Sequence, residues 1–127
     1  SVEVRHPVEV AADDPQHLKA WLSKRVGVDF KLPDLAGEGY SLIGGRLLPA
    51  GNQPAAMLMY EDATRNRIAL VLTAEPEGEE TALHVEQKGK LIACYWRSER
   101  LAFAVAGEMA EEPMMKLAKA IYEQFDS

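Results

Sequence analysis

The sequence predicts an α+β fold: an antiparallel β-meander of about six strands, with an N-terminal and a C-terminal helix packed on one face. Two observations predict it. Apolar residues recur at helical spacing near each end of the chain, whereas the middle carries short apolar runs separated by turn residues. The connections between these runs are too short for the crossovers that parallel strands need, so the strands should pair antiparallel.

Composition predicts a single domain over residues 1–127. The hydrophobic content of 47% is enough for one core. A formal net charge of −6, with no cluster of Lys and Arg, argues against nucleic acid as a partner. No apolar run approaches the roughly 20 residues that span a bilayer, and the single Cys excludes an internal disulfide.

The first helix should begin after Asp13 and Asp14, with Pro15 in its first turn, and should end at Gly27. Its apolar face consists of Leu18, Trp21 and Leu22. The closing helix should begin near Pro113. Its apolar residues repeat at positions i, i+3, i+4, i+7, i+8 and i+11, and they are Met114, Leu117, Ala118, Ile121, Tyr122 and Phe125.

Six strand-like runs lie between the helices, over residues 40–48, 55–61, 67–73, 81–87, 91–97 and 101–106. The connections between successive runs consist of turn residues and are short enough for hairpins, and they include the acidic segment 75–80. The two helices should cover one face of the sheet, over Ile68, Leu70 and Leu72 and over Leu101, Phe103 and Val105.

The opposite face of the sheet is predicted to be less polar than an ordinary solvated face. Either Met57 with Met59, or Ala56 with Leu58 and Tyr60, must point away from the helices, because successive strand residues alternate between faces. The last strand alternates large and small side chains, which permits close approach by another segment. The candidates for a partner surface are therefore Met57, Leu58, Met59, Tyr60, Ala102, Ala104 and Ala106. An equally weighted alternative is that the alanine face packs against Trp21 or Trp96 within the domain.

The candidate metal ligands are His6, His17, His84 and Cys94, although their spacing fits no standard zinc motif. A two-residue loop after the fourth run would place His84 and Cys94 on opposite faces, whereas a three-residue loop would set them directly across from each other. We expect no metal and no cofactor. No catalytic residues are expected either, since no Ser or Cys stands in a nucleophile pattern.

The pair Gly44-Gly45 lies inside a strand run. It lacks the lysine and the following helix of a phosphate-binding loop. A glycine pair in a strand is more typical of a bulge or sharp coil of the sheet, or of a place where another backbone comes close.

Several segments resemble the C-terminal part of predicted transmembrane transcriptional regulators, the anti-sigma factor family of proteobacteria. They are residues 6–10, 17–25, 33–35, 39–49, 54–62, 95–96 and 101–107, in that order. The most specific are Gly-Gly-Arg-Leu-Leu-Pro at 44–49 and Met-Tyr-Glu-Asp at 59–62. One departure is Asn66, which stands where relatives tend to have Gly in a turn.

The resemblance implies a parent protein in the inner membrane, with this domain in the periplasm. A cytoplasmic segment and a transmembrane helix, both absent from this sequence, would reach the cognate extracytoplasmic-function sigma factor. This domain would then regulate by recognising a signal, a protein partner or a regulatory protease of the envelope. The alternatives are a small-ligand or metal-binding periplasmic sensor, and a module that forms a homodimer. The resemblance transfers no catalytic or ligand residue to this chain.

Overall fold

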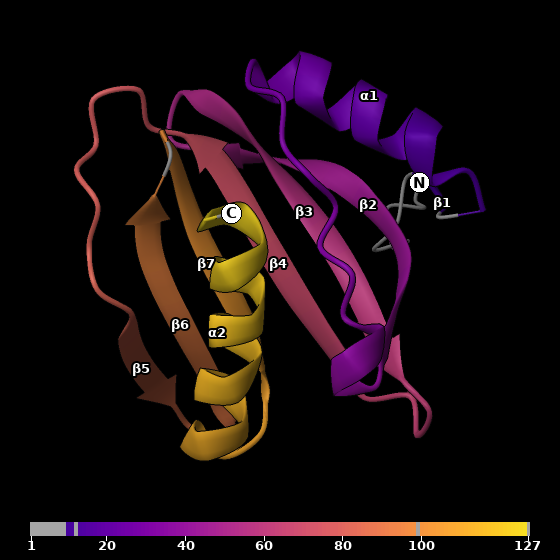
Figure 1. Cartoon of the computed structure of the whole chain (residues 1–127), viewed down its shortest axis with the longest axis vertical. Coiled ribbons are helices and arrows are strands. Elements are labelled where there is room, and N and C mark those ends of the chain that lie inside the picture. Colours follow the sequence, from indigo (N-terminus) through magenta and orange to yellow (C-terminus); the bar gives the residue numbers. More distant parts are fainter. Residues whose placement is uncertain (1–9, 12, 99, 127) are drawn as a thin grey trace.

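A computed structural model describes residues 10–11, 13–98 and 100–126 of the chain (Figure 1). The elements, in chain order, are β1 (Val10–Ala11), α1 (Pro15–Val26), the short 3₁₀ helix η2 (Ala36–Glu38), β2 (Tyr40–Ala50), β3 (Gln53–Asp62), β4 (Arg67–Ala74), β5 (His84–Lys88), β6 (Leu91–Ser98), β7 (Leu101–Glu108) and α2 (Glu111–Asp126).

The predicted fold class is confirmed. The strands form one sheet in which every neighbouring pair is antiparallel. Helix α1 packs on β2 and β3, and α2 packs on β6 and β7. Both helices bury their apolar residues in one continuous core against the same face of the sheet.

The N-terminal helix begins and ends where its sequence signals place it. The carboxylate of Asp14 accepts a hydrogen bond from the backbone N–H of His17 at 3.1 Å, and Pro15 occupies the first turn. Gly27 closes the helix with a φ of 91°, a left-handed conformation that suits glycine. Leu18 and Leu22 are fully buried against the sheet.

The C-terminal helix covers an aromatic cluster on β6 and β7. The ring of Phe103 stacks on Trp96 with centroids 5.0 Å apart, and Phe125 of α2 meets Phe103 edge-on at 4.7 Å. Gln124 also ties α2 to the segment before η2. Its side chain accepts from the N–H of Asp34 at 2.8 Å and donates to the carbonyl of Asp34 at 2.7 Å.

The strand order differs from a single continuous meander. It is β1-β2-β3-β4-β7-β6-β5, so β4 pairs with β7 and the acidic segment after β4 is not a hairpin. Figure 1 shows this connection passing around the ends of β7 and β6 to the far edge. The physical reason lies in the side chains. Strand β7 is apolar on both faces and suits the interior of the sheet, whereas the exposed charges Glu86 and Lys88 suit β5 to an edge.

The fourth predicted run starts later than expected, at His84 instead of Thr81. Thr81 nevertheless continues the pairing through other atoms. Its N–H donates to the carbonyl of Arg97 at 3.1 Å, and its hydroxyl accepts from the Arg97 N–H at 2.9 Å. The edge of β6 is therefore hydrogen-bonded at this position even without a strand.

The glycine pair lies at a bulge, as the sequence suggests, and it also lies beneath side chains of α1. The register of β2 against β3 shifts between Leu42 and Gly44, which is a β-bulge. A Cβ atom added at Gly45 would lie 3.1 Å from Leu22 and 3.2 Å from Leu18. Helix α1 thus lies directly on the strand at a position where only hydrogen fits comfortably.

Candidate functional site: the uncovered face of the sheet

One face of the sheet faces away from both helices, and we call it the open face. Two cross-strand rows define its centre, because residues directly opposite each other on neighbouring strands share a face. One row consists of Arg46, Met57, Val71, Ala104, Tyr95 and His84. The next consists of Gly44, Met59, Ala69, Ala106, Ala93 and Glu86.

Side-chain size varies systematically across the open face. Among the strands of the described residues, β4 is the fourth of seven and is therefore central. On one side of it, β3 presents Met57 and Met59, which we call the methionine strip; on the other, β7 presents Ala102, Ala104 and Ala106, the alanine strip. All five are partly exposed. The open face therefore has a large apolar ridge on one side of its central strand and a low apolar strip on the other.

Two shallow hollows lie toward opposite ends of the open face. The first, of about 490 Å³, has Ala69 and Ala106 among its lining residues, with Met59, Arg67 and Leu91 beside them. The second, of about 380 Å³, is lined by residues including His84, Tyr95, Arg97 and Ala102. Neither combines burial with a convergent set of charged groups, so the face suits a broad apolar contact better than a small polar ligand.

Two of the predicted surface residues are wrong. Leu58 and Tyr60 point into the core, with 0% and 1% of their surface exposed. The hydroxyl of Tyr60 donates to the carbonyl of Pro33 at 2.7 Å, which uses its polar end internally. Burial raises the pKa of Tyr60, and the nearby Asp34 carboxylate raises it further. Because successive residues of β3 alternate between the two faces, burial of Leu58 and Tyr60 places Met57 and Met59 on the open face.

The alternative in which a tryptophan covers the alanine strip is also wrong. Trp96 is buried on the helix-covered face, stacked on Phe103. Trp21 belongs to α1, which lies on that same face, with the Arg25 guanidinium 5.4 Å from its ring. Within the part of the chain that the structure describes, neither tryptophan reaches the open face.

Tyr95 is held in place at the β5 side of the open face. Its ring stacks on that of His84 with centroids 5.5 Å apart. A hydrogen bond to the Glu86 carboxylate is the main cause of the raised pKa of the Tyr95 phenol. The aromatic ring therefore has a defined orientation, which lowers the entropy cost of a contact made to it.

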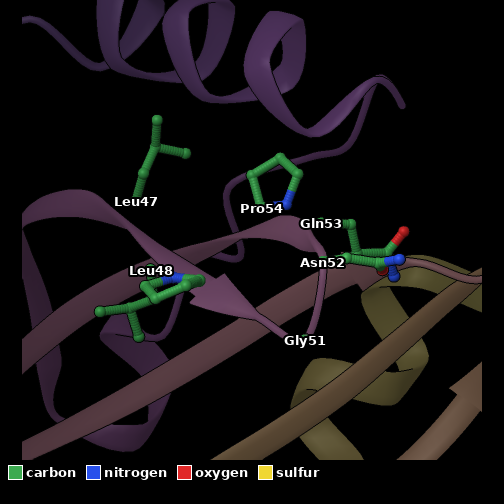
Figure 2. Close-up of a pocket in the computed structure, with 7 residues that line it drawn as sticks. Leu47, Leu48, Gly51, Asn52, Gln53 and Pro54 are labelled. Carbon is green, nitrogen blue, oxygen red and sulfur yellow. The ribbon is translucent and has the colours of Figure 1, made fainter.

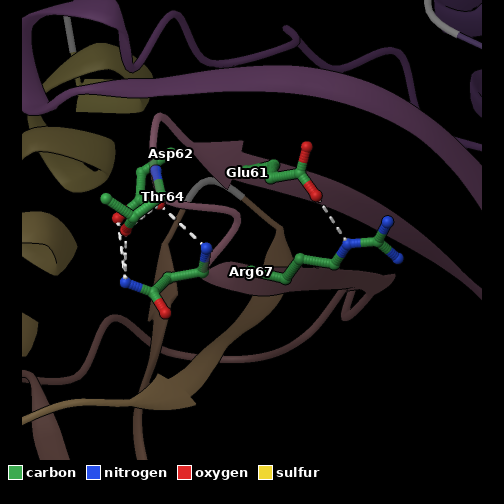
Figure 3. A network of polar contacts seen from close by, with 5 residues as sticks. Glu61, Asp62, Thr64 and Arg67 are labelled. Carbon is green, nitrogen blue, oxygen red and sulfur yellow. Dashed lines mark hydrogen bonds and ion pairs between the residues drawn. The ribbon is translucent and has the colours of Figure 1, made fainter.

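Polar groups gather at the end of the open face where β3 turns into β4 (Figure 3). Arg67 Nε donates to Glu61 at 3.0 Å. In the turn itself, Asp62 accepts from the backbone N–H groups of Thr64 at 2.9 Å and Asn66 at 2.8 Å. These bonds, chiefly that from the Asn66 backbone, lower the pKa of Asp62.

The left-handed residue of this turn is Arg65, with a φ of 69°, and Asn66 is not left-handed. Asn66 instead supplies two donors to Asp62, from its backbone and its side chain. The apolar centre of the open face is thus bordered by a polar turn of fixed geometry, as protein interfaces commonly are.

The candidate metal ligands do not come together. His84 pairs with Tyr95, and Cys94 with Val85, so His84 lies on the open face and Cys94 on the covered one. His17 is exposed on α1, and His6 lies outside the described residues. Over residues 10–11, 13–98 and 100–126, no three His, Cys, Asp or Glu side chains gather as a metal site.

Cys94 is fully buried beneath α2, and burial raises the pKa of its thiol. A hydrogen bond from the backbone of His84 opposes this shift but does not reverse it. The thiolate is therefore disfavoured at neutral pH, and the side chain serves as a small apolar group in the core.

A further hollow, of about 500 Å³, lies at the β2–β3 hairpin (Figure 2). Figure 2 shows Leu47 and Pro54 on the side of the hairpin that faces helix α1, with Leu48 on the other side. Its walls are apolar apart from Asn52 and Gln53. Gln53 is already engaged, since its side chain donates to the carbonyl of Ala74 at 3.0 Å.

No family model matches the chain, and no curated protein matches it. Among the described helices, none is long and apolar enough to cross a membrane. The resemblance to the anti-sigma factor family therefore rests only on sequence motifs, chiefly those at residues 44–49 and 59–62.

Sequence reasoning missed several apolar members of the open face, among them Ala69, Val71, Ala93 and Tyr95. A signal for the first two was present. Since Ile68, Leu70 and Leu72 were expected to face the helices, the residues between them had to face the other way. Tyr95 and Ala93 could be assigned only once the register of β6 against β7 was known.

Proposed function

We propose that this chain is a protein-interaction domain whose open face binds a protein partner, and that it serves as the periplasmic regulatory domain of a membrane-anchored anti-sigma factor. The observation that carries the interaction role is the uncharged centre of the open face. It comprises Met57, Met59, Ala69, Val71, Ala93, Tyr95, Ala104 and Ala106. A sheet face that only contacts solvent would carry mostly polar residues at these positions.

The regulatory assignment is supported by the motif resemblance alone. In such a protein, a cytoplasmic segment of the parent would hold the sigma factor, and this domain would change that state by contact with a partner or regulatory protease in the envelope. The domain needs no chemistry of its own for that role. Its contribution would be a free energy of association that differs between the signalled and unsignalled states.

The test is RNA sequencing of cells whose chromosomal gene for this protein carries Ala104→Asp. This change places a charge in the centre of the open face, where its desolvation opposes any apolar contact. Ala20→Asp is the matched control, because Ala20 is exposed on α1, on the other side of the sheet. Both variant chains are first shown to be folded by circular dichroism.

The expected result is a changed abundance of one set of transcripts sharing a promoter sequence, in Ala104→Asp cells only. If transcripts are unchanged both in these cells and in cells lacking the gene, the anti-sigma role is wrong. If deletion changes the set but Ala104→Asp does not, the open face is not the regulatory surface.

A further inference from the structure

We infer that the partner of the open face is a second copy of this chain, packed sheet against sheet about a two-fold axis that runs along β4. This inference rests on the proposed use of the open face for protein contact. It names the occupant of that same surface. The arrangement of side-chain sizes and the area of the face are the two arguments for it.

The size argument follows from the symmetry of the strand order. Strand β4 has three strands on each side. Rotation about an axis along β4 places β3 of one copy over β7 of the other, and the reverse, as an isologous interface requires. Met57 then faces Ala104 of the second copy, and Met59 faces Ala106. The methionine strip of each copy thus fits over the alanine strip of the other.

The other in-plane axis, perpendicular to the strands, packs less well. It would place β3 over β3 and β7 over β7. Methionine would then meet methionine while two alanine strips faced each other across a gap, and unfilled space between packed layers loses van der Waals contact. The strand-parallel axis is therefore the arrangement that fills the interface evenly. Methionine, with its flexible side chain, adapts well to such a contact.

The area argument compares the face with what a stable interface needs. A third row, through Thr73, Ala102 and Arg97, lies beside the two central rows on the same face. At about 4.8 Å per strand and about 6.8 Å per row, the five inner strands and these three rows cover about 24 by 20 Å. The total surface buried by two copies would be roughly 1,000 Å², or roughly 1,400 Å² if the edge strands take part. These two figures lie on either side of the lower limit of about 1,200 Å² for a specific interface. Because side chains project from the sheet, the surface actually buried would be larger than both figures.

Charge does not oppose the contact. The chain carries a formal charge of −6, yet in the two central rows the only acidic residue is Glu86, on edge strand β5. Much of the acidic character lies elsewhere, in the segment after β4 and on the first turn of α2. Two copies can therefore approach through this face without placing like charges opposite each other at its centre.

The test is sedimentation equilibrium of the purified chain over a concentration series, with three variants. Ala104→Met places a large side chain opposite Met57 of the other copy, and Met57→Ala leaves a gap there; each should raise the dimer Kd at least about tenfold. The double variant Met57→Ala/Ala104→Met exchanges the two sizes and should return the Kd to within about threefold of the original. Within one copy the two positions are separated by Val71 on β4, so the rescue cannot arise from direct contact inside the monomer.

Ala20→Met, on exposed α1, is the control and should leave the Kd unchanged. The unaltered chain should reach twice its monomer mass of 14.0 kDa at high concentration. A chain that stays monomeric, or a dimer whose Kd the double variant does not restore, overturns the inference. A monomer in which Ala104→Asp still alters transcription would refute the second copy as partner while leaving the proposed function intact.

Discussion

Gly45→Ala tests how closely helix α1 lies on the sheet. The added methyl group would lie 3.1 Å from Leu22 Cδ1, 3.1 Å from the carbonyl oxygen of Met57 and 3.2 Å from Leu18 Cδ1. Both leucines are fully buried, so neither can swing into solvent, and the carbonyl belongs to the sheet backbone. Inserting a methyl group into such a contact costs about 1–3 kcal/mol.

Part of that cost is offset, because alanine loses less backbone entropy on folding than glycine, by about 0.4–1 kcal/mol. A net destabilisation of about 1 kcal/mol remains, which corresponds to a fall in Tm of about 3–6 °C for a chain of this length. The assay is urea unfolding followed by circular dichroism, together with a thermal scan.

Gly37→Ala is the matched control. A Cβ atom there meets nothing within 4 Å, and the backbone of Gly37 is not in the left-handed region. This variant should be unchanged or slightly more stable. If Gly45→Ala proves as stable as Gly37→Ala, helix α1 does not pack on β2 as described.

Three further predictions concern the core and the turn. Tyr60→Phe removes the donor to the buried Pro33 carbonyl and should lower the free energy of unfolding, measured in urea, by about 1–2 kcal/mol. Tyr95→Phe should cost clearly less, because Tyr95 is partly exposed on the open face. Asp62 has a folded pKa below its ordinary value of 3.8, so its carboxylate stabilises the fold above that pH, and this stabilisation is lost as the pH falls through the folded pKa. The difference in free energy of unfolding between the original chain and Asp62→Asn, measured in urea, should therefore shrink below about pH 4. A difference that stays constant with pH would contradict the assignment. The buried Cys94 thiol should react with a disulfide reagent at least about 100-fold more slowly in the native chain than in urea, and fast native labelling would show that α2 does not cover it.

The helices and the individual strands could be predicted because their signals are local. Asp14, Pro15 and Gly27 set the limits of α1, and the spacing of apolar residues identifies α2. The order of strands could not be predicted in the same way. Whether β4 pairs with β5 or with β7 depends on contacts between residues far apart in the sequence, and the short acidic segment looked like a hairpin. The exposed charges on β5 were the available sign of an edge strand.

Part of the candidate site was predictable from the sequence, but its orientation was not. On β3 both alternating sets are apolar, so the sequence alone could not decide whether Met57 or Leu58 faces the helices. The decision depends on β4, whose core-facing residues Leu70 and Ile68 lie opposite Leu58 and Tyr60. Tertiary packing, and not the hydrophobic pattern of one strand, fixes the parity.

The most direct test of self-association through the open face is NMR of the chain with ¹³C-labelled methionine methyl groups, recorded over a concentration series. The five methionines lie in different places. Met57 and Met59 are on the open face, and Met114 of α2 is buried in the core. Met109 lies between β7 and α2, and Met115 is partly buried on α2. Association through the open face predicts that the methyl signals of Met57 and Met59 shift with concentration while that of Met114 stays constant. Concentration-dependent shifts confined to Met109 and Met115, or no shift at any methionine, would contradict it.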